Sequence, residues 1–318
     1  MKILIAPLNW GLGHAARCVP VIKKYIADGH EVVIAADGFP MEFLQQEFPS
    51  VRKIDFPSYT IHYSAGNTQI LAMFRNLPPI ISGIRREHKM IRKLQKQEKF
   101  DLIISDNRFG LWNHHTKTVY ITHQLMIKMP ASIKFLEPIA WWLHRQFILK
   151  YDECWIPDDA GKKNLSGDLS HKYPLPRNAH FIGKLSRFLE NSKPQTIKKK
   201  FDVVAVISGI EPQRTIFEHE IIQHYQHSGI PTLIVCGQPS SRPTTYHIGD
   251  VTLTSHLNDQ NLIDIFFAAK KIVCRSGYST IMDLATLNLL HKTKFIPTPG
   301  QTEQEYLYQL QNAKKAVE

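Results

Sequence analysis

Short apolar runs alternate with helix-like segments along most of this 318-residue chain, and this alternation constrains the fold more than any other feature. The runs Lys2–Pro7 and Glu31–Ala36 predict strands, and the spacing between them predicts a helix over Val19–Asp28, ended by Gly29. Strands separated by helical patterns are typical of βαβ units with a parallel sheet, so we predict an α/β fold. Further strands are expected at 101–105, 118–122, 153–157, 179–183, 201–208, 231–236, 251–255, 271–274 and 293–297, and further helices at 41–48, 82–98, parts of 126–151, 215–228, 258–269 and 280–287.

A polar, lysine-rich segment interrupts the alternation at residues 190–200, where Pro194 also breaks any helix. The same alternation restarts after it. We therefore predict two Rossmann-like parallel-sheet domains, residues 1–189 and 201–318, joined by a linker at 190–200. Ligands bind open parallel sheets at the carboxyl ends of the strands, so the expected site is the cleft between the two domains.

Positive charge is concentrated in the first part of the chain. The net charge is +11, and residues 1–200 carry 30 Lys and Arg against 17 Asp and Glu, whereas residues 201–318 carry 9 against 11. Such a field favours an anionic partner, either nucleic acid or lipid headgroups. The basic amphipathic segment at 84–99 and the aromatic segment at 139–149 favour peripheral contact with an anionic membrane. No apolar run is long enough to span a membrane.

A glycine-rich loop follows the first strand and opens a helix, with glycines at Gly11 and Gly13. Glycines let a backbone approach a phosphate, and a helix N-terminus offers free N–H groups. Ala16 stands where a dinucleotide fingerprint has its third glycine, although Asp37 ends the second strand where an NAD ribose would be held. His14 lies at the mouth of this loop, so it is either a general base or a capping or exposed histidine.

Three further loops follow strands in the second half of the chain. The first loop includes an arginine and is suited to bind an anion. The second loop carries hydroxyl and N–H groups that can donate to a phosphate, and a carboxylate that can accept from ribose. The third loop carries amides and carboxylates, which suit sugar hydroxyls. Thr302 and Glu305 in the third loop also fit a capping box. The candidate residues are Ser208, Gly209, Gln213 and Arg214 in the first loop, Arg275, Ser276, Gly277, Ser279, Thr280 and Asp283 in the second, and Gln301, Glu303, Gln304 and Glu305 in the third.

In this order the motifs resemble those of the GT-B nucleotide-sugar glycosyltransferases, and most closely family 28, whose members include the peptidoglycan N-acetylglucosaminyltransferase. The segment 274–289, with Arg-Ser-Gly, a helix and an acidic residue, is the most similar part. The resemblance implies that His14 is the catalytic base or an acceptor-site residue, that Asp283 holds the ribose and that Leu257 lies by the uracil. It also implies that Ser208 and Gly209 lie near the donor, that the loop from Ser276 to Thr280 holds the diphosphate, and that Gln304 and Glu305 contact the donor sugar.

The same resemblance implies an inverting transfer of a hexose or N-acetylhexosamine, such as that of UDP-GlcNAc, from a UDP-sugar to a saccharide or lipid-linked acceptor of the cell envelope. No metal is expected, because no Asp-x-Asp motif is present and the four cysteines form no zinc set. We expect a cytoplasmic protein that contacts the inner face of the membrane. The segment Glu211–Arg214 departs from the family, and the chain ends soon after the fourth motif, where GT-B enzymes have helices that cross back to the first domain.

Several alternatives remain open. A UDP-sugar 2-epimerase shares the two-domain architecture but needs additional carboxylates in the cleft. A hydrolase of nucleotide sugars would use the same donor site. A nucleic-acid-binding protein would fit the isoelectric point of 9.4, although no recognised nucleic-acid motif is present and we expect no nucleic-acid partner. A NAD-dependent dehydrogenase is disfavoured by Ala16 and by the additional phosphate loops.

Overall fold

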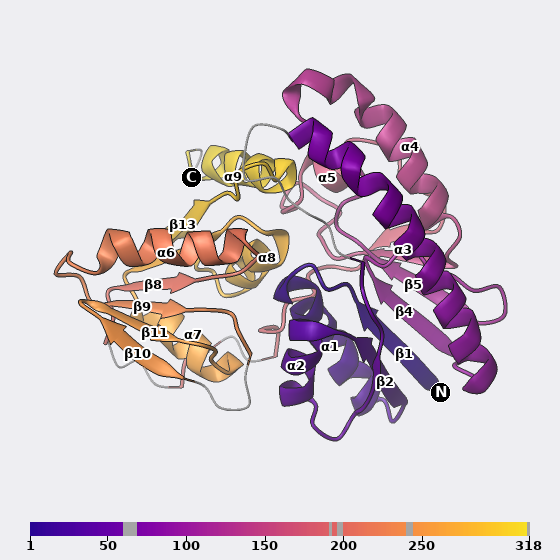
Figure 1. Ribbon diagram of the computed structural model, residues 1–318, viewed down its shortest axis with the longest axis horizontal. Helices are drawn as coiled ribbons and strands as arrows, with labels where there is room; N and C mark the ends of the chain where they lie inside the picture. The colour runs from indigo at the N-terminus through magenta and orange to yellow at the C-terminus, as the bar shows by residue number, and fades with distance from the viewer. Residues whose placement is uncertain (60–68, 191–192, 196–199, 240–243, 317–318) are drawn as a thin grey trace.

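The computed structural model describes residues 1–59, 69–190, 193–195, 200–239 and 244–316. It contains two sheets, one in each half of the chain (Figure 1). This confirms the predicted α/β fold with two parallel-sheet domains. The predicted linker at 190–200 lies partly outside the described residues, so its exact bounds remain a prediction.

The N-terminal sheet has seven strands in the order β3-β2-β1-β4-β5-β6-β7, and all its neighbouring strands run parallel. The chain order reverses between β1 and β4, which makes a crevice at the carboxyl ends of these two strands. The strands are β1 (Lys2–Pro7), β2 (Glu31–Ala36), β3 (Arg52–Asp55), β4 (Leu102–Asp106), β5 (Lys117–Ile121), β6 (Glu153–Ile156) and β7 (Ala179–Phe181).

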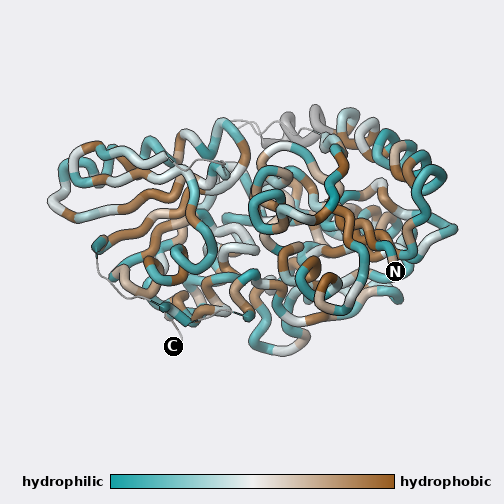
Figure 2. The backbone as a smooth tube through the Cα atoms, turned by 90° about the horizontal axis from the view of Figure 1, so that it is seen from below, coloured by the Kyte–Doolittle hydropathy of each residue, from teal (hydrophilic) through white to brown (hydrophobic). Residues whose placement is uncertain are grey.

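Helices cover both faces of this sheet because its strands are apolar on both sides. One face packs on α1 (Leu12–Ala27) and α2 (Gly38–Glu47) through buried residues such as Val19 and Phe43. The other face packs on α3 (Gln69–Gln97) and α4 (Glu137–Ile148) through Ile91 and Ile148. Figure 2 shows the resulting hydrophobic segments in the interior of each half of the molecule. Shorter elements are η1 (Ala131–Leu136) and α5 (Asp168–His171).

The C-terminal sheet has six strands in the order β10-β11-β9-β8-β12-β13, with β10 antiparallel to β11 and the remaining pairs parallel. Its strands are β8 (Val203–Val206), β9 (Thr232–Val235), β10 (Thr245–Ile248), β11 (Val251–Thr254), β12 (Lys271–Arg275) and β13 (Thr293–Ile296). Its helical elements are α6 (Gln213–Tyr225), α7 (Asp259–Ala268), α8 (Tyr278–Thr286), η2 (Leu290–Lys292) and α9 (Thr302–Lys315).

Helix α9 bridges the two domains, as Figure 1 shows by its place beside α5. Leu307 is buried in the core of the C-terminal domain, while the Thr302 hydroxyl donates to the carbonyl of Lys128 at 2.7 Å. The Tyr306 hydroxyl accepts from the backbone N–H of Asp168 at 2.7 Å. Helix α9, which begins within the fourth motif, therefore contacts both domains.

Several predicted helices begin earlier than expected, and two of them, α1 and α3, begin more than five residues earlier. The helix predicted to start at Val19 starts at Leu12, because buried residues before Val19 already pack on the sheet and override the unfavourable Gly13 and Pro20. His14 consequently lies in its first turn. The helix predicted over 82–98 is α3 and starts at Gln69, so that it includes Pro78 and Pro79. Strands β3 and β10 were not predicted, because both are short and polar.

Candidate active site

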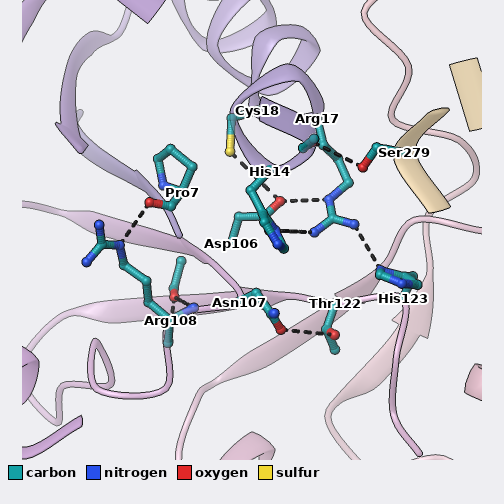
Figure 3. Close-up of polar contacts among 12 residues, drawn as sticks. Pro7, His14, Arg17, Cys18, Asp106, Asn107, Arg108, Thr122, His123 and Ser279 are labelled. Carbon is teal, nitrogen blue, oxygen red and sulfur yellow. Dashed lines mark hydrogen bonds and ion pairs between the residues drawn. The ribbon is translucent and has the colours of Figure 1, made fainter. Parts of the chain in front are cut away.

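The candidate base His14 lies at the crevice between β1 and β4. Asp106 is the last residue of β4 and pairs in register with Pro7 of β1, just before the first glycine loop. His14 Nδ1 lies 2.6 Å from Asp106 Oδ1, and the Asp106 side chain is fully buried (Figure 3). Arg17 Nη2 also lies 3.0 Å from Nδ1, but the Asp106 contact is the shorter one and an ionised carboxylate only accepts hydrogen bonds. We therefore assign the hydrogen of His14 to Nδ1, which leaves Nε2 to take up a proton. This is the arrangement that a histidine needs to act as a general base, and that role of His14 remains a prediction.

Arg17, one turn further along α1, neutralises the buried carboxylate. Its Nε and Nη2 atoms donate to the two oxygens of Asp106 at 2.8 and 2.5 Å, and the Arg17 side chain is only 1% exposed. Burial opposes ionisation of Asp106, but the charges of Arg17 and His14 outweigh it and hold the pKa of Asp106 at about 2. Asp106 is therefore a carboxylate at any physiological pH.

His123, which follows β5, connects Arg17 to the C-terminal domain. Arg17 Nη1 lies 3.0 Å from His123 Nδ1, and His123 Nε2 lies 2.8 Å from Glu303 Oε1 of α9. Because Arg17 is always a donor, Nδ1 must accept and the proton of His123 sits on Nε2. Burial lowers the pKa of His123, which agrees with this neutral form. Tyr278 of α8 stacks on the His123 ring with 4.1 Å between centroids.

The first and third motifs meet directly at the same place. The Ser279 hydroxyl, in the first turn of α8, donates to the carbonyl of Gly13 at 3.1 Å (Figure 3). A Cβ atom at Gly13 would lie 3.0 Å from Ser279 Oγ, and one at Gly11 would lie 3.8 Å from the Cα of Gly209. Gly11 also has φ +100°, and Gly209 has φ +120°. The glycines therefore allow loops of the two domains to approach each other.

A cavity of about 260 Å³ lies between the first and second glycine loops. It is open to solvent on one side and is lined by both domains, so it is a place where a ligand would touch the two glycine loops at once. Its walls are formed by Asn9, Trp10, Gly11, Leu12, Asp37, Phe39, Ser58 and Tyr59 of the N-terminal domain and by Ser208, Gly209, Ile210, Glu211, Arg214 and Gly237 of the C-terminal domain.

The two arginines predicted for the donor site are engaged by the protein itself. Arg214 is 6% exposed and pairs with Glu211 at 2.5 Å and with Glu218 at 2.8 Å. Arg275 is 2% exposed; it donates to the carbonyl of Pro297 at 2.9 Å and approaches the carbonyl of Gln213 at 3.5 Å. These arginines hold the second and fourth motifs in place, which was not expected, and their direct contact with a donor remains a prediction.

Asp283 and Leu257 do not line the cleft cavity. The Asp283 carboxylate accepts from the Ser186 hydroxyl at 2.6 Å and lies 3.7 Å from Arg187, so ribose hydroxyls would have to replace these partners. Burial raises the pKa of Asp283 to about 6. Leu257 lines a separate cavity of about 330 Å³ between α7 and the edge of the sheet, together with residues such as Thr252 and Thr254. Their predicted donor contacts remain untested.

The fourth motif begins α9, but the predicted capping box does not form. Thr302 is the first helical residue and uses its hydroxyl on Lys128, as described above. Instead Gln304 Oε1 accepts from the N–H of Thr298 at 3.0 Å, and Glu305 Oε1 accepts from the N–H of Gly300 at 3.1 Å. Gln304 Nε2 also donates to Gln301 Oε1 at 2.5 Å, and the Ser276 hydroxyl donates to the Gln304 carbonyl at 2.8 Å.

Of the predicted residues, the structure brings His14, Gly11, Gly13, Ser279, Gly209 and Glu303 together across the cleft. Sequence reasoning assigned no site role to Arg17, Asp106 and His123. Asp106 ends a strand, His123 follows one and Arg17 lies in the helix after one, which is the only signal that marks them. Asp37, weighed as a ribose ligand for NAD, instead accepts from the N–H and hydroxyl of Ser58 at 2.8 and 2.7 Å.

Comparison with known proteins finds glycosyltransferases among the similar sequences and structures. Residues 1–127 match the model of glycosyl transferase family 1. An uncharacterised glycosyltransferase of Methanosarcina mazei is 24% identical over 96% of this chain and 82% of its own length. The Streptomyces sp. SF2575 glycosyltransferase SsfS6, solved with thymidine diphosphate, is 12% identical and has a TM-score of 0.54 over 100% of this chain and 90% of its own. A candidate UDP-N-acetylglucosamine 2-epimerase of Listeria monocytogenes is 12% identical and has the same TM-score of 0.54 over 99% of this chain and 89% of its own.

Two Rossmann-like domains that face each other across a cleft define the GT-B fold, and the structural similarities confirm that prediction. The family model that matches the first 127 residues describes glycosyltransferases. The relative that aligns with nearly the whole chain is also a glycosyltransferase. The chain has the GT-B fold, and its predicted resemblance to GT-B glycosyltransferases is confirmed.

Proposed function

We propose that this enzyme transfers a hexose or N-acetylhexosamine from a UDP-sugar to a hydroxyl group of a saccharide or lipid-linked acceptor, with inversion and without a metal. The observation that carries the proposal is the His14–Asp106 pair, which lies directly opposite the N-terminus of α8. A base and an anion-binding helix end are the two groups that glycosyl transfer from a nucleoside diphosphate requires.

In the proposed reaction, His14 Nε2 takes the proton of the acceptor hydroxyl while that oxygen bonds to the anomeric carbon. The bond from this carbon to the diphosphate oxygen breaks, and the nucleoside diphosphate leaves with the electron pair. Attack opposite the leaving group inverts the anomeric configuration. Asp106 keeps the proton of His14 on Nδ1 and stabilises the imidazolium that forms, because it remains ionised throughout.

The negative charge of the leaving group requires stabilisation at the other side of the cleft. Helix α8 begins at Tyr278, after Gly277, and its N-terminus adjoins the first glycine loop. Backbone N–H groups and the positive end of the helix dipole favour a diphosphate there. The hydroxyl groups of Ser279 and Thr280 supply further donors in the same turn, so a metal is not required by this scheme.

A peripheral contact with anionic membrane is part of the proposal. Four apolar residues at helical spacing form an exposed stripe on η1 and α4, and Trp142 in this stripe is 53% exposed. Helix α3 covers the same face of the sheet and exposes basic residues such as Arg85 and Lys89. Among the described residues, no helix has the length and apolar character to cross a membrane. The stripe comprises Phe135, Ile139, Trp142 and Leu143.

Thermal unfolding with UDP, TDP, GDP, CDP or NAD, each with and without EDTA, tests the donor class. A nucleotide at about 100 times its Kd adds roughly 2.7 kcal/mol of stability. We expect UDP to stabilise the protein in the presence of EDTA. TDP belongs in the panel because SsfS6 was solved with it. Stabilisation by NAD alone, or by none of these nucleotides, would contradict the proposal.

Turnover then separates a transferase from an epimerase. With UDP-sugar and no acceptor, ¹H NMR detects inversion at C2 if the enzyme is an epimerase, whereas a transferase leaves the donor unchanged. We expect His14→Ala to keep UDP binding and to lose at least about a hundredfold in turnover, since a positioned base contributes 10²–10⁴-fold. His227→Ala, at an exposed histidine, is the matched control. Near-wild-type turnover of His14→Ala would remove the proposed base.

A further inference from the structure

An unbroken line of polar contacts runs from the candidate base to the helix that carries the fourth motif. It passes from Asp106 through Arg17 and His123 to Glu303, with distances of 2.5 to 3.0 Å at each step. Arg17 and His123 are 1% and 7% exposed. The line therefore runs through buried residues to Glu303, whose side chain is 29% exposed, and joins β4, α1 and the segment after β5 of one domain to α9 of the other.

We propose that Arg17, His123 and Glu303 form a cross-cleft bridge that aligns His14 with a donor sugar held by α9. The proposal rests on the proposed function, since it assigns these side chains a role in the same transfer. All three are positioning residues rather than catalytic ones. Glu303 immediately precedes Gln304 and Glu305, for which we predict contact with the donor sugar.

Docking of α9 does not explain the bridge. Thr302 and Tyr306 already attach this helix to Lys128 and Asp168 of the N-terminal domain. Lys128 also lies over the Tyr306 ring, 4.2 Å from its centroid. A helix fixed in this way does not need a further contact through the buried His123 to the Asp106–Arg17 ion pair. Its connection to Asp106 points to a role in the geometry of the base.

The two hydrogen bonds of the His123 ring allow one arrangement only. Arg17 can only donate, so His123 accepts at Nδ1 and donates from Nε2 to Glu303. A shift of Glu303 therefore moves the ring of His123, and that ring contacts the same guanidinium that holds both oxygens of Asp106. Tyr278 stacks on the ring and its hydroxyl donates to the carbonyl of Pro157 at 2.6 Å, so that rotation of the ring is restricted.

Steady-state kinetics with the UDP-sugar donor test the bridge. His123→Leu removes both hydrogen bonds, and we expect it to lower kcat by at least tenfold, with a smaller change in the donor KM. His123→Gln retains a side-chain acceptor and a donor, so we expect it to recover most of the lost kcat. Thr302→Val is the matched control, because it removes one cross-domain hydrogen bond of the same helix without touching the bridge. Its kcat should stay within twofold of the wild type.

Glu303→Leu and the double variant complete the kinetic test. Residues that act as one bridge are not additive, so we expect the double variant His123→Leu/Glu303→Leu to be no slower than His123→Leu alone. The proposal would be overturned if the losses of kcat in the two single variants multiply in the double variant. It would also be overturned if His123→Leu lowers kcat no more than Thr302→Val does. Tm is measured for each variant, so a loss of kcat that follows Tm across the set also counts against it.

A measurement without substrate tests the bridge independently of the proposed sugar transfer. In ¹H–¹⁵N spectra of the histidine side chains, the His14 Nδ1–H signal is assigned by its loss in His14→Gln. We expect Glu303→Leu to shift this signal and Thr302→Val to leave it in place. If the wild type binds no nucleotide and transfers no sugar, the proposed function fails, but this shift still tests the bridge. An unmoved signal in Glu303→Leu overturns the bridge even if transfer is observed.

Discussion

His14 Nδ1 lies 2.6 Å from Asp106 Oδ1, although 92 residues separate the two in the chain. The pairing of β1 with β4 produces this contact, because it sets the end of β4 beside the loop that follows β1. Arg17 then shares the carboxylate with His14. A base, its orienting carboxylate and a neutralising cation thus arise from two neighbouring strands and one helix.

Asp106→Asn should lower kcat by about a hundredfold or more. The amide no longer fixes the hydrogen on His14 Nδ1, and it leaves the charge of Arg17 uncompensated in a buried position. We expect unfolding in urea to show a loss of about 3–5 kcal/mol for the same reason. Asp28→Asn, at an exposed carboxylate 2.7 Å from Lys24, should leave stability almost unchanged, because solvent screens a surface ion pair. Equal losses in the two variants would be inconsistent with this account.

The first glycine loop and His14 could be predicted from sequence because their signal is local: a strand, two glycines and the start of a helix. The partner Asp106 could not, since its role depends on the order of strands in the sheet. Glu303 was recognised only as part of a polar helix start, and its contact with His123 requires the two domains to face each other. Arg214 was expected at the donor because an arginine after a glycine loop resembles an anion ligand, and Arg275 because it belongs to the Arg-Ser-Gly segment that resembles the family. Glu218, which pairs with Arg214, lies only one turn further along α6, whereas Pro297, which accepts from Arg275, is 22 residues away in the chain.

Gly13→Ala should lower kcat/KM by about tenfold with little effect on stability. The new Cβ would lie 3.0 Å from Ser279 Oγ and displaces the hydroxyl that donates to the Gly13 carbonyl. Loss of that hydrogen bond costs about 1 kcal/mol, and the better helix propensity of alanine offsets it by a similar amount. Donor kinetics and thermal unfolding check this. Gly161→Ala, where no atom lies within 4 Å, is the control, and unchanged kinetics in Gly13→Ala would show that the contact is irrelevant to transfer.

Glu87 should make stability depend on pH near neutrality. Burial raises the pKa of Glu87 to about 7, against an ordinary value of 4.5, even though Arg108 lies 3.0 Å away. A raised folded-state pKa gives a stabilising contribution that is complete below about pH 4.5 and is lost as the pH rises through about 7. We expect the difference in unfolding free energy between wild type and Glu87→Gln to change by about 3 kcal/mol from pH 4.5 to pH 8. A difference independent of pH would contradict the raised pKa.

Trp142→Glu should weaken binding to anionic vesicles by about tenfold or more. Trp142 is 53% exposed within the stripe on η1 and α4, and half-burial of a tryptophan in the interface contributes about 2 kcal/mol. Sedimentation with phosphatidylglycerol vesicles at low salt measures the binding, and phosphatidylcholine vesicles test the need for anionic lipid. Higher salt should weaken binding, because the exposed Arg85 and Lys89 act through screened charges. Ile230→Glu introduces the same charge at an exposed apolar residue of the other domain and should bind like the wild type. Absence of wild-type binding at low salt, or an equal loss in Ile230→Glu, would reject the membrane surface.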